Sequence, residues 1–166
     1  VTALDRSESR LARLRDNLAR TNLHAETVTA DALDWSPGES FDAVLLDAPC
    51  SATGTFRRHP EVLYRARASI IADSADLQSR LLERSADWLR PGGSLVYSVC
   101  SLEPEEGEQR IEAFLSARAD FRIEPPPLLA DGVTPHSGGW LRVLPGMLEA
   151  EGGLDGFFTV HLVRTA

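Results

Sequence analysis

The sequence predicts an α/β fold, in which a parallel sheet carries helices on both faces. Short apolar runs alternate along the chain with longer segments whose leucines recur at the helical period. Strands that are separated by helices run parallel, because each crossover returns the chain to the same edge of the sheet. Four of the expected strand ends carry a reactive or hydrogen-bonding residue, namely Asp5, Asp31, Asp47 and Cys100. Ligands of such sheets bind outside the carboxyl ends of the strands, so these residues indicate a functional edge.

The first part of the chain is expected to contain strands that each end on an aspartate. These strands are residues 1–5, 26–31 and 41–47. Between the first two, residues 8–20 place Leu11, Leu14 and Leu18 on one face, which predicts an amphipathic helix. Ser7 directly precedes this helix and is expected to cap it.

The later part of the chain continues the alternation after an arginine-rich excursion at residues 51–72, in which we expect irregular structure with at most one short helix. The elements expected after it are a helix at 77–89, a strand at 94–100, a helix at 104–118 and strands at 121–125 and 156–163. The Pro-Gly-Gly stretch at 91–93 is expected to stop the first of these helices. Residues 125–153 are expected to form a long loop.

Length and composition limit the class of protein. With 166 residues, of which 43% are hydrophobic and 25% charged, the chain is expected to fold as a single domain over residues 1–166. A net charge of −8 argues against a protein that coats nucleic acid through bulk charge. No apolar run approaches the roughly 20 residues of a membrane-spanning helix, no secretory leader precedes the first strand, and 2 cysteines with 4 scattered histidines offer no metal-ligand spacing. We therefore expect a cytoplasmic protein with free thiols, no metal and no membrane partner.

Asp5 and Asp31 end the first two expected strands. In a nucleotide-binding sheet, an acid at the first position accepts hydrogen bonds from the ribose hydroxyls, and an acid at the next receives the exocyclic amine of adenine. Each aspartate taken singly is equally a helix cap or a solvated loop acid. The pair leaves both interpretations open.

The two cysteines are candidates for covalent chemistry. Asp47, Pro49 and Cys50 lie in the sequence DAPC, which is similar to the acid-x-Pro-x element with which amino-methyltransferases grip the exocyclic amine of a base. Cys50 taken alone is equally a buried, inert thiol. Cys100 is expected at a strand end that faces a helix N-terminus, where a thiolate is stabilised and nucleophilic. The alternative for Cys100 is a packing residue.

Three longer segments around these residues support a family resemblance. DAPCSATGTFRRHPEV, LVYSVCSLEPEEGE and DGFFTVHL closely resemble the Sun (Fmu) type of S-adenosylmethionine-dependent RNA cytosine-C5 methyltransferases, whose bacterial members methylate small-subunit ribosomal RNA. The segment ALDRSESRLARLRDNLAR fits the same pattern, so the resemblance extends over essentially the whole chain. It implies a class I (Rossmann-like) methyltransferase sheet, S-adenosylmethionine as the cofactor and ribosomal RNA as the partner.

The resemblance also implies a role for each candidate residue. Cys100 matches the nucleophile of the family, and Cys50 matches its second cysteine, which is associated with release of the methylated RNA. Asp5 matches the ribose ligand and Asp31 the adenine ligand, while Asp47 is expected between the cofactor and the target base. We hypothesise that Cys100 adds to C6 of a cytosine that has left the RNA stack, and that Cys50 assists the later loss of the enzyme.

A basic segment follows Cys50 in this otherwise acidic chain. Its charged or titratable members are Arg57, Arg58, His59, Arg65 and Arg67. The functional interpretation is contact with RNA phosphates near the target base. The alternative is a solvated charged face.

The sequence departs from the family at its N-terminal end, where the glycine-rich cofactor loop and the strand before it are not found. The expected sheet places that strand between residues 1–5 and 41–47. We therefore expect residues 1–166 to be the C-terminal part of a catalytic domain and to bind the cofactor weakly. One alternative function is an amino-methyltransferase that uses the DAPC loop, although it leaves Cys100 without a role. Another is a non-catalytic RNA-binding module, against which the presence of both cysteines argues.

Overall fold

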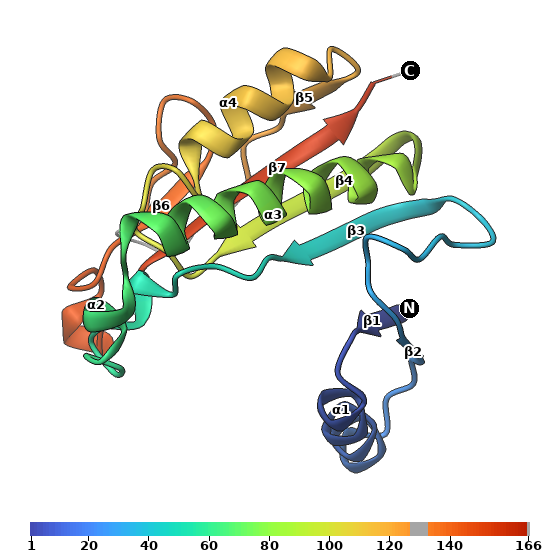
Figure 1. Cartoon of the computed structure of the whole chain (residues 1–166), viewed down its shortest axis with the longest axis horizontal. Helices are drawn as coiled ribbons and strands as arrows, with labels where there is room; N and C mark the ends of the chain where they lie inside the picture. Colours follow the sequence, from blue (N-terminus) through green and yellow to red (C-terminus); the bar gives the residue numbers. More distant parts are fainter. Residues whose placement is uncertain (127–132, 166) are drawn as a thin grey trace. The chain divides into compact units, whose positions relative to one another are not determined.

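A computed structural model describes residues 1–126 and 133–165 of the chain. The chain divides into two compact units, Val1–Gly38 and Glu39–Ala166, whose elements are labelled in Figure 1. The expectation that residues 1–166 form a single domain stays a prediction.

The first unit is a strand, a helix and a second strand that returns parallel to the first. Its elements are β1 (Thr2–Asp5), α1 (Glu8–Thr21) and β2 (Glu26–Thr29). Asp5 pairs opposite Thr29 at the end of the two-stranded sheet. The predicted cap of α1 is confirmed, because the Ser7 hydroxyl accepts the backbone N–H of Arg10 at 3.4 Å. Leu11 is buried on the inner face of the helix.

The second unit contains a five-stranded sheet in the order β3-β4-β7-β5, with β6 paired to β7. The strands are β3 (Phe41–Asp47), β4 (Leu89–Val99), β5 (Phe121–Ile123), β6 (Leu141–Val143) and β7 (Phe157–Arg164). The predicted α/β fold is confirmed, and β3 and β4 are parallel as expected. β7 runs antiparallel to β4, β5 and β6, so the sheet is mixed rather than parallel. Among the described residues, the connection from β5 to β7 contains no α-helix, and an antiparallel pair needs no crossover helix.

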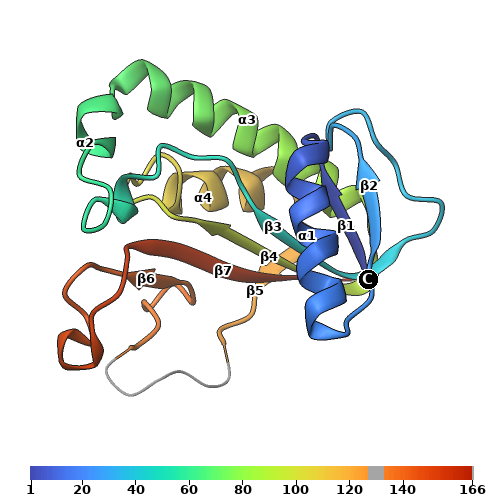
Figure 2. The same cartoon turned by 90° about the horizontal axis from the view of Figure 1, so that it is seen from below.

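One face of this sheet is covered by helices. The helical segments are η1 (Thr53–Thr55), α2 (Val62–Arg65), α3 (Ala68–Asp87), α4 (Glu108–Ala117) and η2 (Glu149–Glu151). α3 and α4 contact each other and lie on the same side of the strands (Figure 2). Leu95, Tyr97 and Phe158, at alternate positions of β4 and β7, are fully buried in the core beneath them. Within the described residues, no helix combines the length and the apolar character needed to cross a membrane.

Several elements differ from the prediction, and the larger differences have local reasons. α3 begins at Ala68 rather than at residue 77. The prediction missed its first turns, because they are largely exposed and carry no buried apolar stripe. β4 already begins at Leu89, and the Pro-Gly-Gly stretch lies inside it as an irregularity in its pairing with β3. α4 begins at Glu108, since the residues before it form turns. The predicted loop at 125–153 contains β6, which at 3 residues is too short to give a periodic pattern.

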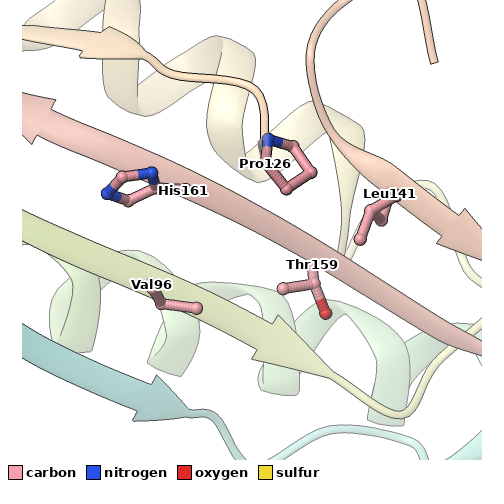
Figure 3. Close-up of a pocket in the computed structure, with 5 residues that line it drawn as sticks. All are labelled: Val96, Pro126, Leu141, Thr159 and His161. Atoms are coloured by element: carbon pink, nitrogen blue, oxygen red, sulfur yellow. The ribbon is translucent and has the colours of Figure 1, made fainter. Parts of the chain in front are cut away.

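The opposite face of the sheet holds a pocket of about 280 Å³ (Figure 3). Its lining residues are Val96, Pro126, Leu141, Thr159 and His161. None of the residues that the sequence predicted for the functional site lines it. On the same sheet, Leu45 of β3 is 72% exposed.

Candidate active site

The two cysteines meet where the parallel strands β3 and β4 end. Both strands point to the same edge of the sheet (Figure 1), and Asp47 of β3 pairs opposite Ser98 of β4. The chain continues from these ends into the loops that carry Cys50 and Cys100. Their Sγ atoms lie 3.5 Å apart, and both thiols are free and partly buried. The structure thus brings together two thiols that are 50 positions apart in the sequence.

One hydrogen bond between the thiols separates their pKa values. Donation from the Cys50 thiol lowers the pKa of Cys100 from an ordinary 9.0 to about 7, although burial and the negative charges of Asp47 and Glu106 act in the opposite direction. The same hydrogen bond, followed by burial, raises the pKa of Cys50. At neutral pH about half of the Cys100 side chains are therefore thiolates beside a Cys50 thiol, and the thiolate is the nucleophilic form.

The expected cause of this reactivity was wrong. The sequence predicted that a helix N-terminus next to Cys100 would stabilise the thiolate, but α4 begins only at Glu108. The cause that lowers the pKa of Cys100 most is the hydrogen bond from Cys50. The direction of the shift agrees with a nucleophilic Cys100.

The loop after Cys50 is held by backbone contacts to two other loops. The N–H of Gly54 donates to the carbonyl of Cys100 at 3.0 Å, and the N–H of Gly156 donates to the carbonyl of Gly54 at 2.7 Å. A Cβ atom on Gly54 would lie 2.0 Å from the Gly156 carbonyl oxygen, so the backbones approach too closely for any other residue. These contacts fix the two cysteine loops relative to each other.

A buried carboxylate contacts both loops that carry the thiols. Glu106 is 0% exposed, and its Oε1 atom accepts the backbone N–H of Ser51 at 2.8 Å and the side-chain amide of Gln78 at 3.1 Å. Its Oε2 atom accepts the hydroxyls of Ser51 and Ser101, the second at 2.5 Å. The sequence analysis missed this residue, because acids after a proline are typical of an exposed first helical turn. The feature of the sequence that could have pointed to a shared acceptor is that a serine follows each cysteine.

Asp47 lies at the same edge as the thiols. It is the last residue of β3 and is exposed. Its charge acts on Cys100 by raising the pKa of that thiol, which is the expected effect of a neighbouring carboxylate. Asp47 is therefore close enough to influence Cys100, while its expected place between the cofactor and the target base stays a prediction.

Asp5 and Asp31 belong to the first unit, at neighbouring strand ends. Oδ1 of Asp5 accepts the N–H of Ser7 at 2.7 Å and the Arg10 guanidinium at 2.9 Å. Asp31 lies just after β2 rather than at its end, and its Oδ1 accepts the N–H of Leu33 at 2.9 Å. The cofactor-binding roles of both aspartates stay predictions. The recorded hydrogen bonds give both aspartates the turn-stabilising role that was the alternative.

Part of the basic segment forms ion pairs with a carboxylate from the C-terminal part of the chain. Asp155, only 8% exposed, accepts the Nε–H of Arg58 at 2.7 Å and lies 3.9 Å from Nε of Arg57. The hydrogen bond from Arg58 lowers the pKa of Asp155 below its ordinary value. His59 lies 3.3 Å from Glu61. Arg57 and Arg58 therefore join the loop after Cys50 to the loop before β7, while the recorded partner of His59 lies within its own segment.

The other predicted RNA-contacting residues lie further along the segment. Arg65 at the end of α2 and Arg67 before α3 are both exposed. Tyr64 precedes Arg65 in α2 and is 85% exposed. An exposed aromatic ring among arginines is a surface of the kind that single-stranded RNA contacts.

Comparison with known proteins now identifies the family. The sequence model described as 16S rRNA methyltransferase RsmB/F matches residues 1–163. The chain belongs to this family. RsmB/F proteins are S-adenosylmethionine-dependent methyltransferases, as the resemblance predicted. The chain is 43% identical over 167 residues to ribosomal RNA small subunit methyltransferase B of Vibrio cholerae and 38% identical to that of Shewanella oneidensis. It spans 36% and 37% of the length of these RsmB/F relatives.

Solved structures agree with the RsmB/F assignment. NSun6 from Pyrococcus horikoshii, solved with SFG, superposes with a TM-score of 0.83 at 28% identity over 99% of this chain and 41% of that one. A methyltransferase homolog from Pyrococcus horikoshii gives 0.77 at 31% identity, over 98% and 52%. An rRNA methylase from Streptococcus thermophilus, at 13% identity and a TM-score of 0.53, shares the fold. The predicted Rossmann-like methyltransferase fold is confirmed.

Proposed function

We propose that this chain is the catalytic part of an enzyme that methylates C5 of a cytosine in small-subunit ribosomal RNA through a covalent bond between Cys100 and C6. The observation that supports it most is the thiol pair, in which Cys50 donates to Cys100 at 3.5 Å and lowers the pKa of Cys100 to about 7. A thiolate at the carboxyl end of a strand has the reactivity and the place that this chemistry needs.

The reaction begins with the Cys100 thiolate. C5 of cytosine is a poor nucleophile, and addition of the thiolate to C6 opens the C5–C6 double bond and makes C5 enamine-like. S-adenosylmethionine supplies the methyl group that C5 takes up. Asp47, beside Cys100 at the strand ends, holds the exocyclic amine or a protonated N3 of the base and stabilises the charge that develops in the ring.

The reaction ends with the departure of the same thiolate. Loss of the C5 proton restores the C5–C6 double bond and expels Cys100. A thiol that is stabilised as thiolate leaves faster, and the Cys50 hydrogen bond supplies that stabilisation. Cys50 thus acts in release through this hydrogen bond to the departing thiolate.

The remaining predicted residues bind cofactor and RNA in this proposal. Asp5 takes the ribose hydroxyls of the cofactor and Asp31 its adenine amine, which suits the carboxylate chemistry of both side chains at the ends of neighbouring strands. Arg65 and Arg67 contact RNA phosphates, with Tyr64 as a stacking surface. Arg57, Arg58 and His59 contribute positive charge from the loop that Asp155 holds in place.

The test uses a chimera in which this chain replaces the matching part of the Vibrio cholerae relative, alongside the chain itself. Unmethylated small-subunit ribosomal RNA is incubated with S-adenosylmethionine, and the nucleosides are analysed by mass spectrometry. The proposal expects 5-methylcytidine, and a stable protein adduct when the RNA contains 5-fluorocytosine.

Other products would identify other functions. Methylation on the exocyclic nitrogen without an adduct would replace the proposal with an amino-methyltransferase. RNA binding without methyl transfer by the chimera would replace it with a binding module.

A further inference from the structure

Glu106 contacts the residue that follows each cysteine. Ser51 is joined to Cys50 by a peptide bond whose N–H donates to Glu106 Oε1 at 2.8 Å. Ser101 follows Cys100, and its hydroxyl donates to Glu106 Oε2 at 2.5 Å. We propose that Glu106 is a positioning residue that fixes the spacing of the two thiols by holding both cysteine loops on one carboxylate. This inference rests on the proposed function, in which that spacing serves attack and release.

The chemistry of the side chain suits this task. An ionised carboxylate only accepts hydrogen bonds and has room for about four donors. Glu106 receives donors from Ser51, Ser101 and Gln78, and the structure records no ion pair to it among the described residues. Burial without these donors would be costly, so the carboxylate and the two loops stabilise one another's positions.

Buried neighbours hold Glu106 itself in place. The Tyr97 hydroxyl, on β4, donates to the Glu106 carbonyl at 2.6 Å. The side-chain amide of Gln78, on α3, donates to Glu106 and also to the carbonyl of Pro49 at 2.9 Å. Tyr97 and Gln78 are both 0% exposed. Cys50 is therefore held through Pro49 on one side and through Ser51 on the other, and both contacts converge on the same buried group.

Positioning and charge predict opposite effects of removing Glu106. The groups that act on the Cys100 thiol are the Cys50 thiol, Asp47 and Glu106. The negative charge of Glu106 raises the pKa of Cys100, so loss of the charge alone would lower that pKa and speed alkylation. Loss of the spacing would break the hydrogen bond from Cys50 and move the pKa of Cys100 from about 7 towards its ordinary 9.0.

The experiment measures alkylation of Cys100 by iodoacetamide across about pH 5 to 10, using residues 1–166 and peptide mass spectrometry. Glu106→Ala is expected to move the midpoint upward by up to about two pH units, and to slow alkylation at pH 7 by roughly five- to eightfold. The thiolate fraction falls about 50-fold, and the higher intrinsic reactivity of a more basic thiolate offsets part of that loss. Glu105→Ala removes an exposed carboxylate from the same turn and is expected to leave the midpoint unchanged. A midpoint in Glu106→Ala that is unchanged or lower would overturn the inference.

A second variant covers the case in which circular dichroism shows that Glu106→Ala does not fold. Ser101→Ala removes the donor beside Cys100 and leaves the charge of Glu106 in place. It is expected to raise the midpoint of Cys100 alkylation, whereas an unchanged midpoint rejects positioning by Glu106. Because these measurements need neither RNA nor cofactor, their failure leaves the proposed function standing. Failure to trap an RNA adduct would reject the function and leave the thiol geometry untouched.

Discussion

The hydrogen bond between the two thiols predicts that Cys50→Ala makes Cys100 a weaker nucleophile at neutral pH. The bond accounts for most of the lowering of the Cys100 pKa from 9.0 to about 7. Without it, the thiolate fraction at pH 7 falls from about one half to about one hundredth. Since a more basic thiolate reacts roughly six to ten times faster, the net rate of alkylation should fall about five- to eightfold.

The assay follows reaction of the chain with iodoacetamide as a function of pH. Cys50→Ala leaves Cys100 as the single cysteine, so the signal needs no assignment. Cys50→Ser keeps an O–H donor at the same place and is the matched control, with a midpoint expected nearer 7. Truncation at Cys50 also admits water to Cys100, which by itself lowers the pKa, so the sign of the change separates the two causes. A midpoint that stays near 7 in Cys50→Ala would refute the reasoning.

Three further changes test other parts of the structure. Gly54→Ala should lower the free energy of unfolding by roughly 1–3 kcal/mol in urea titrations, because its Cβ would lie 2.0 Å from a carbonyl oxygen. Gly38→Ala is the control and should match wild type, since a Cβ at Gly38 meets nothing within 4 Å. The hydrogen bond from Arg118 lowers the pKa of Asp120. Asp120 therefore stabilises the fold at pH values above the pKa that it has in the unfolded chain, and this contribution is lost as the pH falls through the lowered folded-state value. Asp120→Asn should show a smaller loss of stability below about pH 4, and an acid-unfolding curve of unchanged steepness would contradict this. Arg67→Ala in the chimera should reduce the slope of log Kd against log salt for single-stranded ribosomal RNA by about 0.7, and an unchanged slope would exclude a phosphate contact.

Much of the fold, and the meeting of the candidate reactive residues at one edge of the sheet, could be predicted from the sequence. The alternation of strands and helices placed Asp47 and Cys100 at strand ends, because the carboxyl ends of parallel strands share an edge. The direct contact between the thiols could not be predicted, since it depends on the register in which Asp47 pairs with Ser98. The antiparallel course of β7 was also missed, because nothing in a strand's own sequence encodes the direction of its partner.

The contacts within the site that the sequence did not predict join segments that are far apart along the chain. Glu106 lies among acids that follow a proline, and only the packed structure distinguishes this buried carboxylate from its exposed neighbours. The ion pair between Arg58 and Asp155, which lies 97 positions away in the sequence, was not predicted either, and contact of Arg58 with RNA stays a prediction. Both contacts join segments that are distant along the chain, and local patterns carry no information about them.

Detection of the covalent bond between Cys100 and RNA is the measurement that tests the central claim most directly. The chimera carrying Cys50→Ala is incubated with S-adenosylmethionine and unmodified ribosomal RNA, and adducts are resolved by denaturing electrophoresis and peptide mass spectrometry. Attack by Cys100 and release by Cys50 predict an adduct at Cys100 that accumulates in Cys50→Ala and is absent from Cys100→Ala. An adduct that persists in Cys100→Ala and disappears in Cys50→Ala would reverse the two roles and contradict the account.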